Sequence, residues 1–354
     1  MLFYQKGLDE KIIVFEFYKI RKFVKHVSFM RSPVLVKRIF KGYYNSLLRG
    51  NDTLRSIELA IDYKCQATCH KCYSANLGTH FPNPNYVDKP LMTVDEIRNT
   101  IDQAMDLGII HVNITGGEPT LRSDLAEIVE VCRPKEIMVS LVTNALSLSK
   151  EKLKTLSELG LNLLQISLDS ADPKTHDELR GVPGCYEKVM QTATWAKEFG
   201  INLCFTTVLS TESTSNGSET RKLLKVAEQM NAYLLICDSA SVGGWSEQGE
   251  KVMTREERDT TLFELMKHPL TRHHNMYNFR GKIGCPASHE KVYITSHGDV
   301  TPCNLVHDTY GNVLNMPLAD ILKKMRNDPL WSQTHDTCPR YLEEEFATRG
   351  GVAI

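Results

Sequence analysis

The chain has 354 residues, too many for one small module and suited to one large α/β barrel or two domains. Apolar residues make up 42% and charged residues 24%, as in ordinary globular proteins with a sizeable core, and no apolar run reaches the roughly 18–20 residues that span a bilayer. The start, MLFYQKGLDEK, lacks the order of a secretory signal. We therefore expect a cytoplasmic protein, in which ten cysteines indicate metal or redox chemistry and not a disulfide framework.

The basic charge is concentrated at the N-terminus. Residues 1–55 contain twelve Lys or Arg and four acidic residues, a net charge of +8, so the rest carries −9 within the total of −1. Two amphipathic helices are predicted here, one with an apolar stripe from Ile13 to Val27 and one that starts at Ser32–Pro33. Two readings stay open: residues 1–50 contact an anionic surface (a membrane, a lipid-linked substrate or an acidic leader peptide), or they pack on the main body.

Strands and helices alternate from residue 56 to residue 240, which predicts parallel βα units. The first helix candidate of this block, TVDEIRNTIDQAMDLG, opens on a capping box of Thr93 and Glu96. We expect strands at 56–62, 109–115, 136–144, 161–169, 201–209 and 232–240, and helices at 93–108, 123–132, 149–159, 186–200 and 219–230.

Two further parts follow the alternating block. Residues 241–284 form a connector with a helix near 254–268. Residues 285–354 contain KVYITSHGDVTPC, which predicts a hairpin around His297–Asp299, and then a helix at 317–327. This last part is too small to fold alone and needs a metal or the main body.

Three cysteines follow directly after the first strand. Cys65, Cys69 and Cys72 are spaced C-x3-C-x2-C in a loop at the strand's carboxyl end, where parallel α/β folds build their sites. Core cysteines, or zinc with a remote fourth ligand, are the alternatives. Three thiolates on a [4Fe–4S] cluster would leave one iron open to a small molecule.

This spacing, with Tyr73 after the third cysteine, resembles the radical S-adenosylmethionine (SAM) superfamily. The resemblance implies a partial (βα)6 barrel whose [4Fe–4S] cluster binds SAM and cleaves it reductively, and the resulting radical abstracts a hydrogen atom from the substrate. It also implies a reductant such as flavodoxin or ferredoxin. No nucleic acid partner is expected.

A second motif, NITGGEPTLR, follows the second strand. It resembles the family's GGE motif, which implies that Gly116, Gly117 and Glu118 bind the SAM amine. Polar residues at the ends of the next two strands match family positions for the SAM carboxylate and ribose, although strand-end caps are the alternative: Thr143, Asn144, Ser167 and Asp169. The arginine that family members often carry near the fifth strand is not evident in NLCFTTVLS.

A second set of cysteines lies near the C-terminus. Cys285, Cys303 and Cys338 include the spacing C-x12-G-x4-C, which resembles the SPASM and Twitch auxiliary-cluster domains. With only Cys338 after the hairpin, the resemblance favours Twitch and one auxiliary [4Fe–4S] cluster, whose fourth ligand is His335, Asp336 or none. Such a cluster would aid substrate binding or electron transfer. A hairpin with buried cysteines is the alternative.

The remaining candidates are isolated. Cys237, at the end of the sixth strand, is a candidate hydrogen-atom donor, whereas Cys132, Cys185 and Cys204 are expected in the core. The histidines at 268, 273 and 274 are expected at a solvated helix end.

We thus expect a two-cluster radical SAM enzyme of biosynthesis that acts on a small molecule or on a lipid- or sugar-linked metabolite. The alternatives are a maturase of a ribosomally made peptide or protein, and a non-catalytic iron–sulfur protein. The expected parts are 1–55, 56–240, 241–284 and 285–354.

Overall fold

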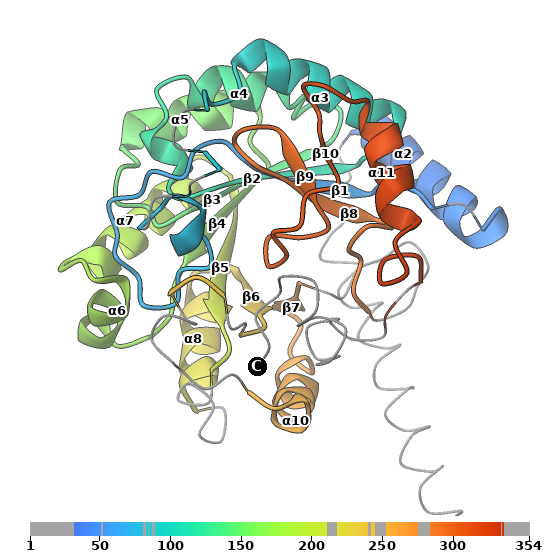
Figure 1. The fold of residues 1–354 in the computed structure, drawn as a ribbon. Coiled ribbons are helices and arrows are strands. Elements are labelled where there is room, and N and C mark those ends of the chain that lie inside the picture. Colours follow the sequence, from blue (N-terminus) through green and yellow to red (C-terminus); the bar gives the residue numbers. More distant parts are fainter. Residues whose placement is uncertain are drawn as a thin grey trace, which may run out of the picture.

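A ten-stranded sheet with the strand order β10-β9-β8-β1-β2-β3-β4-β5-β6-β7 organises the fold of the computed structural model (Figure 1). The model describes residues 32–50, 52–80, 83, 85–86, 89–210, 218–239, 242–244, 253–274, 284–333 and 335. The first predicted amphipathic helix, Cys338 and Asp336 lie outside these ranges.

The six predicted parallel strands are confirmed. They pair in sequence order and continue into a seventh strand. Their bounds are β1 Ser56–Ala60, β2 His111–Thr115, β3 Met138–Thr143, β4 Leu163–Ser167, β5 Asn202–Val208, β6 Tyr233–Cys237 and β7 Thr271–His273.

Helices cover the outer face of this curved sheet (Figure 1). They are α3 Val94–Asp106, α4 Leu125–Val131, α5 Lys150–Leu159, α6 Pro173–Arg180, α7 Cys185–Glu198 and α8 Ser218–Gln229. The capping box of Thr93 and Glu96 is present at the start of α3. The helix then buries Ile97 and Ile101 completely in the core beneath the sheet, because these positions share one face at a helical spacing.

The C-terminal hairpin extends the same sheet. Strand β8 Lys291–Ile294 pairs in parallel with β1, and β9 Asp299–Thr301 and β10 Gly311–Asn312 continue in antiparallel order. Helix α11 Leu318–Arg326 lies over these strands beside α3 (Figure 1), and its first amide donates to Gln103 Oε1 at 2.7 Å. The hairpin therefore gains the support of the main body that its size requires.

The predicted second N-terminal helix is α2 Pro33–Tyr43, followed by a π-helical turn, η2 Tyr44–Leu48. Ser32 caps α2 through its hydroxyl, which accepts from the Leu35 amide at 3.4 Å. The large apolar side chains of these two segments are buried only at the start: Leu35 is buried, whereas Leu47 is 55% exposed. The two short 3₁₀ helices are η3 Ala75–Leu77 and η4 Pro119–Leu121, and the connector carries α10 Arg255–Leu265.

No helix in the described part of the chain is long and apolar enough to cross a membrane.

Candidate active site

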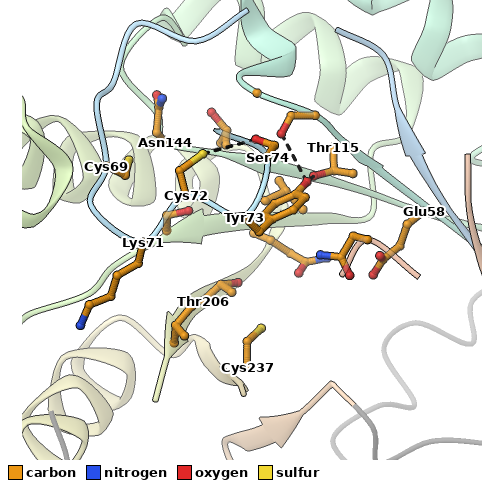
Figure 2. A pocket seen from close by; sticks show the side chains of 18 of the residues that line it. Glu58, Cys69, Lys71, Cys72, Tyr73, Ser74, Thr115, Asn144, Thr206 and Cys237 are labelled. Carbon is orange, nitrogen blue, oxygen red and sulfur yellow. Dashed lines mark hydrogen bonds between the residues drawn. The ribbon is translucent and has the colours of Figure 1, made fainter. Parts of the chain in front are cut away.

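A cavity of about 260 Å³ opens at the carboxyl ends of the parallel strands. Its walls come from the cysteine loop (residues 62–74), from the ends of β2 to β6, and from the C-terminal hairpin. Figure 2 shows Cys69, Cys72 and Tyr73 on one side of this space and Thr206 and Cys237 on another. Every predicted cofactor-binding residue lines the cavity except Glu118, and the three thiols of the first cysteine set line it together.

The GGE segment holds the start of the cysteine loop. The amides of Gly117 and Glu118 donate to the carbonyls of Asp62 and Lys64, each at 2.8 Å. A Cβ at Gly116 would stand 2.1 Å from the Asp62 carbonyl oxygen, and one at Gly117 would stand 2.3 Å from that of Tyr63. The glycines are therefore needed for close approach to the loop's own backbone.

Two other segments clamp the rest of the loop. At the end of α6, the carbonyls of Leu179 and Arg180 accept from loop amides at 3.2 Å. After β6, the amide of Gly244 donates to the Cys72 carbonyl at 2.9 Å, and a Cβ at Gly243 would lie 2.3 Å from the same oxygen. The three thiols are thus placed by backbone contacts from widely separated parts of the chain.

The thiols lie in surroundings that disfavour the thiolate form. Burial raises the pKa of Cys65 to about 12 and raises that of Cys72. A thiol binds metal as the thiolate, and burial disfavours that anion, so thiolates at these positions need a nearby positive charge such as a metal centre. Two side chains point hydrogen-bond donors at sulfur: Asn144 Nδ2 lies 3.5 Å from Cys65 Sγ, and Arg180 Nη1 lies 3.6 Å from Cys69 Sγ.

The distances between potential ligand atoms bear on whether a single zinc ion could bind the thiols. Thiolates that share one tetrahedral zinc at about 2.3 Å lie roughly 3.8 Å apart. Among the described residues, three or more potential ligand atoms come within 4.8 Å of one another only in a different group, formed by Asp238, His273 and His274. Cys65, Cys69 and Cys72 do not form such a group, and their ligation of an iron–sulfur cluster stays a prediction.

Glu118 is placed differently from its neighbours in the motif. Its side chain is fully buried, and its carboxylate accepts from the Thr120 amide and hydroxyl, the Thr143 hydroxyl and the Asn144 amide, at 2.5–3.1 Å. Burial raises its pKa, and these hydrogen bonds oppose that rise. The carboxylate therefore orients the end of β3, which itself lines the cavity at Thr143 and Asn144.

Arg180 is a cavity residue that the sequence did not identify. It ends α6, a helix that was not predicted although Asp172 and Pro173 form a typical start. Its guanidinium pairs with Asp169 at 2.7 Å and faces the Cys69 thiol. A buried cation thus stands between the cysteine loop and the end of β4.

Polar side chains from the strands also line the cavity inside the barrel. Glu58 on β1 and Lys291 on β8 form an ion pair of 2.8 Å, with side chains only 18% and 12% exposed. Burial alone would lower the pKa of Lys291, but Glu58 and the neighbouring Cys303 and Cys285 thiols raise it. Gln165 Nε2 donates to Asn113 Oδ1 at 2.9 Å, and both residues line the same cavity.

Cys237 lines the cavity at the end of β6 (Figure 2). Burial raises the pKa of this thiol to about 12, so it stays protonated at neutral pH, the form that a hydrogen-atom donor needs. Cys132, Cys185 and Cys204 are buried in the core region, as expected.

The expectation of a solvated helix end at the histidines is wrong for two of them. His273 belongs to β7 and is buried, and His274 lines the cavity. His273 Nε2 lies 3.0 Å from Asp238 Oδ1. Burial opposes ionisation of Asp238, but this bond and the nearby charges of His274, His273 and Arg258 hold its pKa well below the usual range.

The second cysteine set is described in part. Cys285 and Cys303 both pack partly buried against the core, and the Cys285 amide donates to the His335 carbonyl at 2.9 Å. The His335 ring lies with Nε2 2.6 Å from the Leu330 carbonyl. Asn304 and Leu305, directly after Cys303, line the cavity, so the hairpin forms part of its wall.

Family models match both parts of the chain. The model for the Radical SAM superfamily matches residues 61–224, which include the cysteine loop and the GGE segment. Residues 61–224 therefore form a radical SAM superfamily domain. The model for SPASM, an iron-sulfur cluster-binding domain, matches residues 285–340, and the chain therefore combines a radical SAM domain, which implies a [4Fe–4S] cluster and SAM, with an auxiliary iron–sulfur domain.

Three relatives illustrate the range of similar proteins. The PqqA peptide cyclase of Rhizobium meliloti is 26% identical over 56% of this chain and 50% of its own length. The AdoMet-dependent heme synthase of Nitratidesulfovibrio vulgaris is 23% identical over 78% and 80%. The crystal structure of Streptococcus suis SuiB bound to precursor peptide SuiA shares the fold, with a TM-score of 0.62, 20% identity and coverage of 79% of this chain and 66% of that chain.

This chain thus spans half the length of the first of these curated relatives. The comparisons and the sheet confirm the prediction of a radical SAM barrel with a C-terminal cluster module. The exact domain limits and the roles of single site residues stay predictions.

Proposed function

We propose that this radical SAM enzyme modifies a ribosomally made peptide. The cyclase relative is named for a peptide substrate, and the SuiB structure contains a precursor peptide. This favours what the sequence suggested as an alternative over a small molecule or a lipid- or sugar-linked metabolite. The heme synthase relative keeps a small-molecule substrate as the second candidate.

The observation that carries the proposal is the composition of the cavity wall. Cys65, Cys69 and Cys72 share one cavity with residues of the C-terminal hairpin. A substrate in this space would lie between the two expected cluster sites. When bound, the cluster and SAM supply the radical chemistry, and the protein supplies binding and orientation.

The chain's own residues then have distinct roles. Cys65, Cys69 and Cys72 would hold the cluster, and the backbone of Gly116 and Gly117 faces the space beside it. SAM would be bound by polar groups at the ends of β3 and β4, those of Thr143, Asn144, Ser167 and Asp169. Tyr73 lines the cavity beside them. Tyr73 is fixed by its hydroxyl, which lies 3.2 Å from Thr115 Oγ1.

Replacing Cys65, Cys69 and Cys72 together by Ala tests the first half of the proposal. After anaerobic reconstitution we expect the variant to lose its share of iron and to form no 5′-deoxyadenosine, because no thiolate remains to hold the cluster. Cys132→Ala, a buried cysteine outside the cavity, is the control and should keep the product. Undiminished 5′-deoxyadenosine in the triple variant would contradict the assignment.

The peptide itself is tested separately. Short peptides encoded beside this chain's gene would be incubated with the reconstituted enzyme, SAM and reductant, and their masses followed. A mass change that requires SAM supports a peptide maturase. SAM cleavage with no peptide changed would favour the small-molecule candidate.

We also propose that the N-terminal part contacts an anionic surface. Phe40 and Leu48 are 70% and 76% exposed on α2 and η2, in a segment with net charge +8 over residues 1–55. Exposed apolar groups beside basic ones are typical of interfacial helices. Flotation with vesicles that contain acidic lipid should recover the full chain in a salt-sensitive way. Equal recovery of a deletion of residues 1–50 would favour packing on the barrel.

A further inference from the structure

A cluster of one aspartate and two histidines lies on the cavity wall apart from the cysteines. Asp238 follows β6, His273 ends β7, and His274 follows it; Asp238 and His274 line the cavity. One ligand atom from each of the three residues lies within 4.8 Å of the other two. The pairing of β6 with β7 creates this group, since Ile236 is in register with His273.

The distances within the group suit a shared ion. His273 Nε2 lies 3.0 Å from Asp238 Oδ1, and His274 Nε2 lies 3.8 Å from Asp238 Oδ2. The second distance is too long for a hydrogen bond. Two ligands that bind one metal at about 2.0–2.2 Å lie roughly 3–4 Å apart, so both distances fit ligands on a single ion.

The carboxylate of Asp238 has an oxygen available for such an ion. The side chain is 1% exposed, and Oδ2 accepts no hydrogen bond within the described part of the chain. A buried carboxylate oxygen without a donor is costly. Arg258 Nη1 and His274 Nε2 each lie 3.8 Å from this oxygen.

Arg258 does not occupy this position. Its Nε and Nη2 both donate to Asp259 Oδ1, the former at 2.9 Å. The Asp259 carboxylate therefore offsets much of the guanidinium charge that would otherwise repel a metal ion beside Asp238.

We propose that Asp238, His273 and His274 bind one divalent transition metal ion of the zinc or iron(II) class. Two imidazoles and one carboxylate are donors that these metals prefer, whereas magnesium and calcium prefer oxygen ligands. Three protein ligands leave coordination positions open, and the cavity adjoins them. There the ion holds a carboxylate or carbonyl oxygen of the substrate, a role that rests on the proposed function, whereas metal binding itself does not.

Zinc binding to the full-length, cluster-reconstituted enzyme tests the site. After equilibrium dialysis with ZnCl₂ we expect about one zinc per chain in excess over the variants, with the iron content unchanged. His274→Gln and Asp238→Asn should each weaken zinc binding at least tenfold. His268→Gln is the matched control, because His268 lies in the same segment but pairs with Glu228 outside the cavity.

X-ray absorption at the zinc edge distinguishes this site from the cysteines. Nitrogen and oxygen scatterers without sulfur support the proposal, whereas sulfur scatterers, or zinc gained together with a loss of cluster iron and sulfide, overturn it. Zinc binding that is equal in the enzyme and in His274→Gln also overturns it. His274 is 21% exposed at its side chain, so this variant serves if the buried Asp238→Asn fails to fold.

Discussion

At the scale of single residues, Glu118 shows how a motif can be recognised while the placement of its side chain is not. The sequence predicted a direct contact with the SAM amine, and that contact stays a prediction. In the structure the carboxylate is enclosed by Thr120, Thr143 and Asn144 and does not line the cavity. Only the fold reveals this, because Thr143 on β3 and Asn144 directly after it lie 25 and 26 residues away in sequence.

Glu118→Gln is therefore expected to lower stability. Either orientation of the amide turns an NH₂ group toward a backbone donor, that of Thr120 or that of Asn144. An unsatisfied buried group of this kind costs about 1–3 kcal/mol. Chemical denaturation would measure the loss, with Glu130→Gln, an exposed glutamate, as the control expected within about 0.5 kcal/mol of the parent. Unchanged stability with weaker SAM binding would instead support direct contact.

At the scale of elements, the long periodic segments and the hairpin with its clear turn were predictable, whereas short strands without a pattern were not. Strands β1 to β6 are apolar runs between clear helix signals, and the capping box at Thr93 marks the start of α3. Strand β7 has three residues, and TRH carries no strand pattern, so the histidines were assigned to a helix end. Pairing with β6, a tertiary effect, makes these residues a strand.

The contact of Gly243 and Gly244 with the cysteine loop, which the sequence did not single out, can be tested by substitution. Gly243→Ala would place a Cβ 2.3 Å from the Cys72 carbonyl oxygen at a φ of +58°. We expect it to displace the loop and lower the iron content after reconstitution. Gly200→Ala is the matched control, because Gly200 has a φ of +71° but nothing within 4 Å of its added Cβ.

The control variant should lose only the roughly 1–2 kcal/mol of stability that a left-handed backbone costs an alanine, and it should keep its iron. Equal iron in the two variants would mean that the loop tolerates movement at Cys72.

At the scale of the whole molecule, the hairpin and the barrel form one sheet. The sequence predicted the hairpin from its turn at His297–Asp299 but could not show which strand it joins. That partner is β1, with Ser56 in register with Lys291 across 235 residues. The pairing brings the Glu58–Lys291 ion pair, Asn304 and Leu305 to the cavity that the cysteine loop also lines. Substrate binding and the auxiliary domain are therefore expected to be coupled.

Replacing Cys285, Cys303 and Cys338 together by Ser tests that coupling. If both clusters contain four irons, the iron per chain should fall by roughly half. SAM cleavage without substrate should persist, because Cys65, Cys69 and Cys72 and their three clamps are unchanged. Conversion of substrate should be lost, since Asn304 and Leu305, which line the cavity, directly follow Cys303. Cys204→Ala, a buried cysteine on β5, should keep both iron and conversion.

Full iron in the triple variant would exclude an auxiliary cluster held by these cysteines. Halved iron with normal conversion would restrict the cluster to a structural role, because a cavity wall that tolerates its loss cannot depend on it for substrate binding or electron transfer.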